Sequence, residues 1–312
     1  MNAYITLDIG GTHIRCALFT DENATIPKRI EKIKTVDENE SAIDRIISII
    51  ESTWPTDSQV KGISAAAPGS VDVNHGTVIL APNIQGWKNI ELRRILSTHF
   101  NVEVFVNNDA RLAALGEWKR GAGIGHDNLL YFTISTGLGG GAICQGKLLE
   151  GSIGIATELG HITIEDGGPP CGCGKLGHLE AFSSGTGIEN YYWEKIIEAR
   201  FQQNKTRSDI SAKVIASLAM EGDALARRAF ERAGYYLGIG VSNYLHIFNP
   251  SCIILGGGVA LSQDLFFESF NKSLESHVMS KTYLENLVIK DALLGDNAGL
   301  IGSLEYLKEH MQ

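Results

Sequence analysis

Short apolar runs that end in glycine or asparagine turns recur along the chain, and segments with apolar residues at helical spacing lie between them. The first kind of run predicts buried strands, and apolar residues three and four apart predict helices. We expect strands at residues 4–9, 14–19, 102–106, 129–134, 142–148 and 288–294, and strands that run into turns within 62–72 and 250–259. We expect helical segments at residues 41–53, 110–121, 187–200, 211–245 and 297–310, and an exposed loop at 202–209. This alternation is typical of an α/β protein.

The first predicted hairpin, residues 4–19, turns at Gly10, Gly11 and Thr12. Glycines let backbone N–H groups approach a phosphate closely, and the threonine hydroxyl adds a donor. Asp8, at the end of the first strand, could hold a magnesium ion through water. Taken alone, this pattern fits a plain hairpin with a Gly-Gly turn equally well.

A second segment, residues 129–148, repeats the order of apolar strand, small polar and glycine turn, and returning strand. Its turn contains Thr136, Gly137 and Gly139. It is the nearest feature to an internal repeat in this sequence. Two such hairpins facing each other would form a nucleotide cradle, so the repeat favours phosphate binding for both.

Two further turns carry candidate binding residues. Gly257 and Gly258 follow a strand and precede a predicted helix, which suits a phosphate or the ribose and adenine side of a nucleotide. A tight strand–helix junction is the alternative there. Asn83 opens a polar loop, residues 83–88, that contains a tryptophan and suits either a sugar or an ordinary loop.

The strand at 102–106 ends in Asn107, Asn108 and Asp109, directly before a predicted helix. Open α/β sheets place their chemistry at the C-terminal ends of strands. Asp109 could also be the N-cap of the helix, although two preceding asparagines are unusual for capping alone. Asp109 is therefore a candidate catalytic carboxylate, and the N-cap alternative stays open.

The stretch between residues 158 and 180 is dense in metal-binding side chains. Four candidate ligands fall within it, and Glu158 and Glu180 flank them. Two cysteines and two histidines are enough to close a tetrahedral zinc shell, although one residue between the cysteines is not zinc-finger spacing. The alternative is two free thiols and two loop histidines. The candidate ligands are His161, Cys171, Cys173 and His178.

Chain length, net charge and cysteine content limit the kinds of protein that this sequence can encode. The 312 residues are enough for two lobes, and a net charge of −9 gives no electrostatic case for a nucleic-acid partner. Five cysteines without disulfide-framework spacing favour a reducing compartment. The N-terminus has no signal-peptide pattern and no apolar run approaches eighteen residues, so we expect no membrane partner and a cytoplasmic protein.

Five motifs together resemble the ROK family of repressors, open reading frames and sugar kinases, within the actin, Hsp70 and sugar-kinase fold. Leu7 to Thr12 resembles the family's first phosphate motif, and Thr133 to Gly141 the second. The Asn107–Asp109 motif resembles its catalytic motif, and Leu255 to Gly258 its adenosine-side turn. The stretch from Glu158 to Glu180 resembles its zinc and sugar signature, the most specific of the five.

The resemblance implies roles for these residues. Asp109 would be the general base that takes the proton from a sugar hydroxyl as its oxygen attacks the γ-phosphorus of ATP. Magnesium would accompany ATP, and a structural zinc ion would brace His161, which has one ring nitrogen on the metal and the other toward the sugar. The expected sugar-binding residues are Gly69, Asn83, Asn108, Asp109, Glu158, His161 and Glu180.

The implied fold is a two-lobed actin-like ATPase, with duplicated ribonuclease H-like domains and a nucleotide and sugar cleft between the lobes. The sequence has no Pro- or Gly-rich linker, so we place the lobe boundary after the helix that ends near Trp118. The small lobe is then residues 1–118 plus the C-terminal helix at about 297–312, and the large lobe is 119–296 with a zinc-binding insertion. A homodimer is expected by analogy with family kinases.

The expected activity is phosphorylation of the 6-hydroxyl of glucose. Other hexoses are open alternatives, namely N-acetylglucosamine, N-acetylmannosamine, fructose or a β-glucoside. A sugar-responsive transcriptional regulator is less favoured, because Asp8 lies too near the start for a preceding DNA-binding domain. An actin-like or chaperone ATPase would not need the zinc and sugar signature. One departure from the family pattern is His178, which stands where a third cysteine is common.

Overall fold

A computed structural model describes residues 2–20, 26–37, 40–198 and 206–311. The chain forms two compact units, which we describe separately. Unit 1 comprises Met1–Asp127, Gly141–Thr157 and Ala292–Gln312, and unit 2 comprises Asn128–Gly140 and Glu158–Asp291. The lobes expected from the sequence differ from these units at residues 119–127, 141–157 and 292–296.

Unit 1 is built on a five-stranded sheet with the order β3-β2-β1-β4-β8. Its strands are β1 (Asn2–Ile9), β2 (His13–Phe19), β3 (Arg29–Lys34), β4 (Gln59–Ala67) and β8 (Glu103–Asn108). Strands β1 and β2 form the predicted antiparallel hairpin, and β1, β4 and β8 run parallel. Because β1, β4 and β8 run parallel, their C-terminal ends, which carry Asp8 and the Asn107–Asn108 pair, lie at one edge of the sheet.

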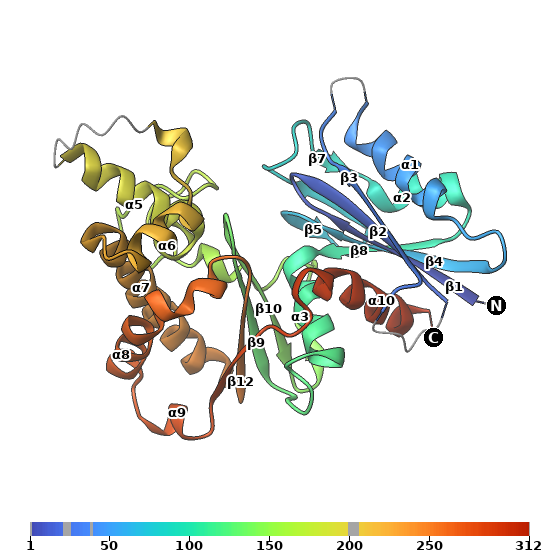
Figure 1. Cartoon of the computed structure of the whole chain (residues 1–312). Coiled ribbons are helices and arrows are strands. Elements are labelled where there is room, and N and C mark those ends of the chain that lie inside the picture. The colour runs from blue at the N-terminus through green and yellow to red at the C-terminus, as the bar shows by residue number, and fades with distance from the viewer. Residues whose placement is uncertain (1, 21–25, 38–39, 199–205, 312) are drawn as a thin grey trace. The chain divides into compact units, whose positions relative to one another are not determined.

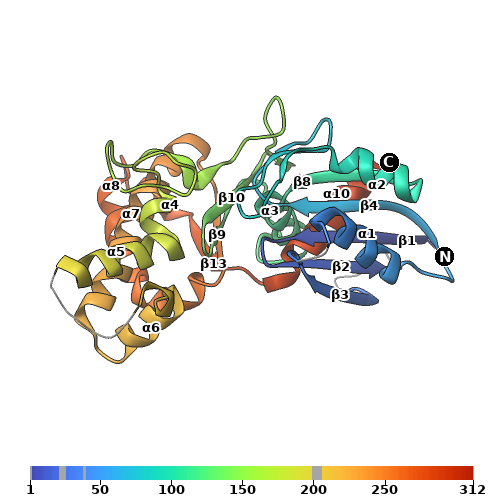
Figure 2. The ribbon, with the colours of Figure 1, turned by 90° about the horizontal axis from the view of Figure 1, so that it is seen from above.

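Helices cover both faces of this sheet. Helices α1 (Ala42–Thr53) and α10 (Ala298–His310) lie against opposite faces, as Figures 1 and 2 show. Side chains of β1 alternate accordingly: Ile5 and Leu7 belong to one buried cluster with Ile46 of α1, and Tyr4 belongs to another with Leu300 of α10. Unit 1 is completed by α2 (Leu92–Phe100), α3 (Asp109–Arg120) and a small sheet of β5 (Ser70–Asp72), β6 (Thr77–Leu80) and β7 (Lys88–Ile90).

Unit 2 combines the second sheet with a helical layer. Its sheet holds β9 (Leu129–Ile134), the first part of β10 (Leu138–Cys144), β12 (Cys252–Gly256) and β13 (Val288–Asp291). Strand β10 continues into unit 1, where its end pairs with β11 (Lys147–Leu148). The 25-residue helix α7 (Ala224–Phe248) packs against α4 (Glu180–Ser183), α5 (Gly185–Glu198), α6 (Ala212–Met220) and α8 (Phe267–His277). Short helix α9 (Thr282–Glu285) precedes β13.

Several predicted boundaries were wrong. The single strand expected at 142–148 is the end of β10, a turn at Gln145 and Gly146 with positive φ, and β11. The helical segment 211–245 breaks at residues 221–223 into α6 and α7, each capped by its own side chain, Ser211 and Asp223. Residues 202–205 of the expected loop and 199–200 of the expected helix lie outside the described residues. Among the described residues, none of the helices has the length and apolar character to cross a bilayer.

Candidate functional site

The predicted site residues divide between the two units. Unit 1 carries Asp8, Gly10, Gly11, Thr12, Gly69, Asn83, Asn108 and Asp109. Unit 2 carries Thr136, Gly137, Gly139, Glu158, His161, Cys171, Cys173, His178, Glu180, Gly257 and Gly258. Each half is built independently, and we take them in turn.

Hydrogen bonds with neighbouring residues hold the turn between β1 and β2. The Gly10 N–H donates to the His13 carbonyl at 2.9 Å, and the Thr35 hydroxyl donates to the Gly10 carbonyl at 2.6 Å. A Cβ on Gly11 would lie 2.9 Å from Cβ of Asn83, so glycine is required there. The structure therefore brings two predicted residues together, Gly11 of the phosphate turn and Asn83 of the polar loop.

Asp8, another predicted site residue of unit 1, lies at the C-terminal end of β1. Its pKa is raised to about 6, mainly by burial; the Arg15 guanidinium lowers the pKa and the nearby Asp296 carboxylate adds to the rise. The Arg15 guanidinium lies 3.8 Å from the Asp8 carboxylate, and it also donates to the Asp296 carbonyl and to Asn297 Oδ1. The Asp8 side chain is 29% exposed and its carboxylate is partly desolvated. A nearby cation would therefore stabilise the charged form of this carboxylate.

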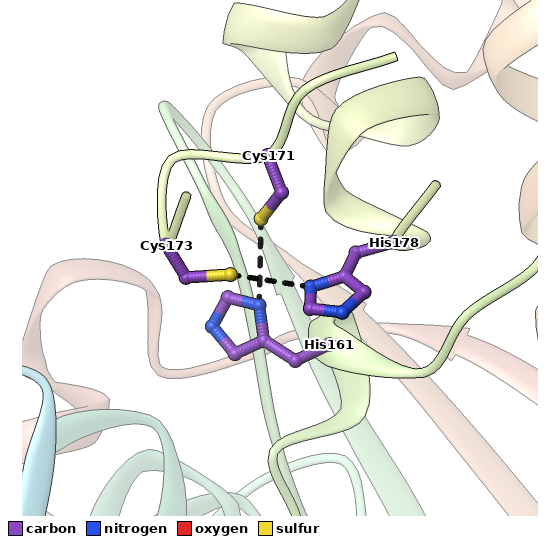
Figure 3. Close-up of side chains that lie close together, drawn as sticks. All are labelled: His161, Cys171, Cys173 and His178. Atoms are coloured by element: carbon purple, nitrogen blue, oxygen red, sulfur yellow. Dashed lines mark hydrogen bonds between the residues drawn. The ribbon is translucent and has the colours of Figure 1, made fainter. Parts of the chain in front are cut away.

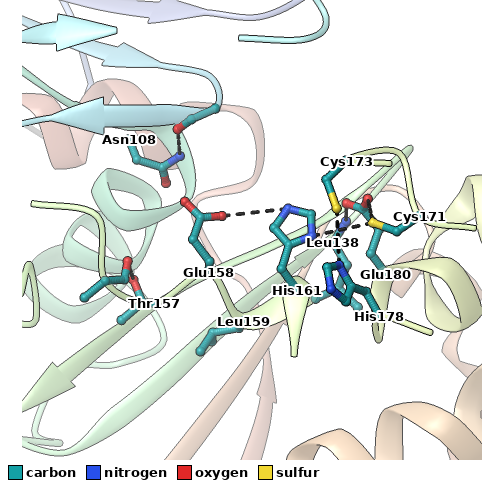
Figure 4. Close-up of polar contacts among 12 residues, drawn as sticks. Asn108, Leu138, Thr157, Glu158, Leu159, His161, Cys171, Cys173, His178 and Glu180 are labelled. Atoms are coloured by element: carbon teal, nitrogen blue, oxygen red, sulfur yellow. Dashed lines mark hydrogen bonds and ion pairs between the residues drawn. The ribbon is translucent and has the colours of Figure 1, made fainter. Parts of the chain in front are cut away.

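The junction of β8 and α3 places Asp109 in the first turn of the helix. The N-cap is Asn108, not Asp109, because Asn108 Oδ1 accepts from the Arg111 N–H at 3.1 Å. Asn108 Nδ2 donates to the Gly69 carbonyl at 2.9 Å, as Figure 4 shows. The N-cap alternative for Asp109 was therefore wrong, and Asn108 links two residues predicted to face a sugar, Gly69 and Asp109.

Gly69 needs to be glycine for conformational reasons. Its φ is +76°, and a Cβ there would lie 2.1 Å from the Leu80 carbonyl oxygen. The turn that follows β4 is consequently tight, and it presents the Gly69 carbonyl to Asn108.

In unit 2, two glycine turns lie side by side. The Ser135 N–H donates to the Gly137 carbonyl at 2.9 Å, which closes the turn before β10. The Gly258 N–H donates to Ser135 Oγ at 3.2 Å, and Gly257 has φ +89° with no room for a Cβ beside the Ile134 carbonyl. The second hairpin turn and the Gly257–Gly258 turn are therefore joined by a hydrogen bond and lie next to each other in this unit.

Four predicted ligands converge in unit 2 (Figure 3). The ligand atoms of His161, Cys171, Cys173 and His178 all lie within 4.8 Å of one another. Cys171 Sγ is 3.6 Å from His161 Nδ1, and Cys173 Sγ is 3.3 Å from His178 Nδ1. On a tetrahedral zinc ion, with bonds of about 2.3 Å to sulfur and about 2.0 Å to nitrogen, a sulfur and a nitrogen ligand lie about 3.6 Å apart. The donor set and spacing fit such an ion.

The surroundings shift the pKa values of Cys171 and His178. Burial is the main cause that raises the pKa of the Cys171 thiol to about 12, with the neighbouring Glu180 carboxylate adding to it. Burial, and then the positive charge that His161 would carry, lowers the pKa of His178. A neutral His178 is the form that binds a metal, and a cation would offset the penalty on the Cys171 thiolate.

Two carboxylates flank the cluster in different ways. Glu180 Oε1 accepts from Cys171 Sγ at 3.1 Å, and its Oε2 accepts from the Leu138 N–H at 3.0 Å. Glu180 therefore joins the cluster to the start of β10, directly after Gly137. Glu158 Oε2 lies 3.9 Å from His161 Nε2, the ring nitrogen that faces away from Cys171 (Figure 4).

An aromatic brace that the sequence did not identify supports the loop between His161 and Cys171. The Tyr236 hydroxyl of α7 donates to Glu165 Oε2 at 2.6 Å, and its ring stacks on Phe182 at 3.9 Å. Arg232 lies over both rings, 4.8 Å from the centre of Phe182 and 5.1 Å from that of Tyr236. Phe182 shares a buried cluster with Cys171, so the brace reaches the metal ligands.

Comparisons with known proteins give the family context. The model of the ROK family matches residues 4–310. A glucokinase of Halalkalibacterium halodurans is 34% identical over 96% of this chain and 93% of its own length. A xylose repressor of Caldicellulosiruptor bescii is 30% identical over 97% of this chain and 77% of its own.

A solved structure extends this likeness to the fold. The ROK family glucokinase of Streptomyces griseus, in complex with glucose and AMPPNP, is 30% identical and superposes with a TM-score of 0.83, covering 98% of this chain and 99% of that one. The α/β architecture with its two five-stranded sheets is thus the actin-like ATPase fold. With the family model matching nearly its entire length, the chain belongs to the ROK family.

Proposed function

We propose that this chain, an ATP-dependent sugar kinase, transfers the γ-phosphoryl group of ATP to the 6-hydroxyl of glucose. The observation that carries the proposal is Asp109 at the start of α3, next to Asn108 and Gly69, in a chain that is similar to glucokinases. The related Streptomyces griseus enzyme binds glucose and an ATP analogue, which supports the same pair of ligands here.

Asp109 acts as the general base in this proposal. Its carboxylate accepts the proton of the 6-hydroxyl while that oxygen attacks the γ-phosphorus, and ADP leaves. Asn108 orients neighbouring hydroxyls from its position beside Asp109, and Gly69 and Asn83 line the same half. Glu158, His161 and Glu180 supply further hydrogen bonds to the sugar. Phosphoryl transfer relies mainly on positioning and electrostatics, so these contacts carry much of the rate enhancement.

The two glycine turns of unit 2 and the Gly10–Thr12 turn of unit 1 bind the nucleotide. Backbone N–H groups of Gly11, Gly137 and Gly139 and the hydroxyls of Thr12 and Thr136 face the phosphates, while Gly257 and Gly258 lie on the adenosine side. Gly10, whose N–H donates to the His13 carbonyl, shapes the turn. Asp8 would hold a magnesium ion bound with ATP, and that ion would supply positive charge to the phosphates.

The cluster of His161, Cys171, Cys173 and His178 holds a structural zinc ion. With four protein ligands it has no open coordination position, so the ion takes no part in the chemistry. Its role is to fix the orientation and tautomer of His161, whose Nε2 then stays available to the sugar.

A sugar-responsive regulator is the second candidate, and the likeness to xylose repressors favours it. The catalytic motif argues for the kinase, because a regulator that only senses a sugar needs no general base. Specific DNA binding in a gel-shift assay, abolished by a sugar, would support the regulator. A homodimer remains a prediction for either function.

A coupled ADP-release assay tests the substrate. We expect glucose to give the highest kcat/KM among glucose, N-acetylglucosamine, N-acetylmannosamine, fructose and a β-glucoside, and 6-deoxyglucose to give no turnover because it lacks the acceptor oxygen. A higher kcat/KM for another hexose would reassign the substrate. ATP hydrolysis that ignores every sugar would contradict the kinase.

Replacing the base tests the mechanism. Asp109→Ala should lower kcat by about 10²- to 10⁴-fold, the typical contribution of a general base, while glucose binding by calorimetry stays near wild type. Asp44→Asn is the matched control, because Asp44 is also an acid in the first turn of a helix of unit 1. Near wild-type turnover in Asp109→Ala would refute the assignment.

Metal analysis tests the zinc site. Protein purified without added zinc should contain one equivalent, and Cys171→Ser and His178→Ala should each lose most of it, with weaker glucose binding. Cys144→Ser serves as the control, because this half-buried thiol lies outside the cluster. Less than half an equivalent in the wild-type protein would count against the site.

The half-buried Asp8 should leave a pH signature. Its folded-state pKa of about 6 exceeds the ordinary value of 3.8, so the folded state holds the proton more tightly and wild-type stability falls as the pH rises between these values. Asp8→Asn removes this loss. Its stability advantage should grow between about pH 4 and 6, reach at most about 3 kcal/mol and then level off.

The same substitution should impair catalysis at pH 8, because the ionised carboxylate is lost. Chemical denaturation and kinetics, each measured across this pH range, check the two effects. An advantage that is largest at pH 4, or unchanged activity at pH 8, would contradict the role given to Asp8.

A further inference from the structure

A buried polar network lies behind the β8–α3 junction, within unit 1. Asn107, the last residue but one of β8, has no exposed surface. Its Nδ2 donates to Glu150 Oε1 at 2.7 Å, and its Oδ1 accepts from the N–H of Asn108 at 2.7 Å. Both ends of the Asn107 amide are therefore occupied, one by a carboxylate and one by the backbone of the next residue.

Glu150 connects this strand end to the C-terminal helix. The same Oε1 atom accepts from the hydroxyl of Tyr306 in α10 at 2.8 Å, and Tyr306 is only 2% exposed. Arg111 of α3, 1% exposed, donates to the Gly154 carbonyl of the segment that follows Glu150. Glu150 is consequently a shared acceptor for groups from two separate elements, β8 and α10.

Loss of this carboxylate would leave two buried donors without their acceptor. A buried donor that loses its partner costs about 1–3 kcal/mol. If the Asn107 amide rotates to bring Nδ2 to a new acceptor, the hydrogen bond that Oδ1 accepts from the Asn108 N–H breaks. The disturbance would then reach Asn108, which caps α3 and precedes Asp109.

We propose that Glu150 is a positioning residue for the general base: through Asn107 it fixes the end of β8, and thereby Asp109, while Tyr306 holds Glu150 in place. The inference rests on the proposed function, because it concerns the same base. It assigns to Glu150 no contact with sugar or nucleotide.

Three variants separate this role from general support of the fold. Glu150→Ala removes the acceptor, Glu150→Gln keeps an oxygen that can accept both hydrogen bonds, and Tyr306→Phe removes one donor. Glu117→Gln is the matched control. Glu117 is a fully buried carboxylate near the other end of α3, and it accepts from the N–H groups of Ala122 and Leu294 at 2.8 and 2.7 Å.

We expect Glu150→Ala to lower kcat by about 10- to 100-fold, the effect of a displacement near 1 Å, with little change in the KM for ATP. Glu150→Gln should stay within about threefold of wild type, and Tyr306→Phe should fall between the two. Glu117→Gln should lower the melting temperature without a comparable loss of kcat. Wild-type kcat in Glu150→Ala, or an equal loss in Glu117→Gln, would overturn the proposal.

Amide hydrogen exchange gives a readout that needs no turnover. The N–H groups of residues 108–111 should exchange faster in Glu150→Ala than in wild type, and at the wild-type rate in Glu117→Gln. Unchanged exchange in Glu150→Ala would refute the positioning role even if kcat falls. If the wild-type protein phosphorylates no sugar, the proposed function fails, while the exchange result still decides whether Glu150 holds this junction.

Discussion

The side chain of Asn108 fixes the point at which β8 becomes α3, and the candidate base depends on that point. Its amide donates to the Gly69 carbonyl at 2.9 Å and accepts from the Arg111 N–H at 3.1 Å. Because the Asn108 side chain both donates and accepts a hydrogen bond, it fixes the backbone conformation at this residue. Asp109 follows at once, so its place is determined by the cap, by the tight turn at Gly69 and by the network behind Asn107.

Unit 2 differs from unit 1, because its candidate metal ligands lie in a segment with little regular structure, between β11 and α4. In the loop from His161 to His178, four candidate metal ligands converge, and the brace of Tyr236 and Arg232 supports it. Glu180 ties this loop to the turn that begins β10. The candidate sugar residues and the candidate phosphate turn of this unit are therefore linked by one carboxylate, which couples their positions.

Motifs that lie in short stretches of the chain could be predicted from local sequence patterns. Contacts between residues far apart in the sequence could not. The two hairpins, the Asn107–Asp109 motif and the ligand set all lie in short stretches whose spacing is visible in the sequence. Strand β3 was missed because its residues are mostly exposed and polar, and α2 because its apolar face is short. Glu150 was missed because its partners lie 43 and 156 residues away, and no local spacing indicates such a pairing. The N-cap was left as an alternative role for Asp109 and is Asn108 in the structure; residue type could not separate the two, because Asn and Asp both cap helices well.

The central claim is that Asp109 is the base for the 6-hydroxyl of glucose, and a crystal structure with glucose and a non-hydrolysable ATP analogue tests it most directly. The account predicts the 6-hydroxyl oxygen about 2.6–3.2 Å from an Asp109 carboxylate oxygen and facing the γ-phosphorus. A complex with both ligands bound, in which that hydroxyl reaches Asp109 neither directly nor through one water molecule, would contradict it.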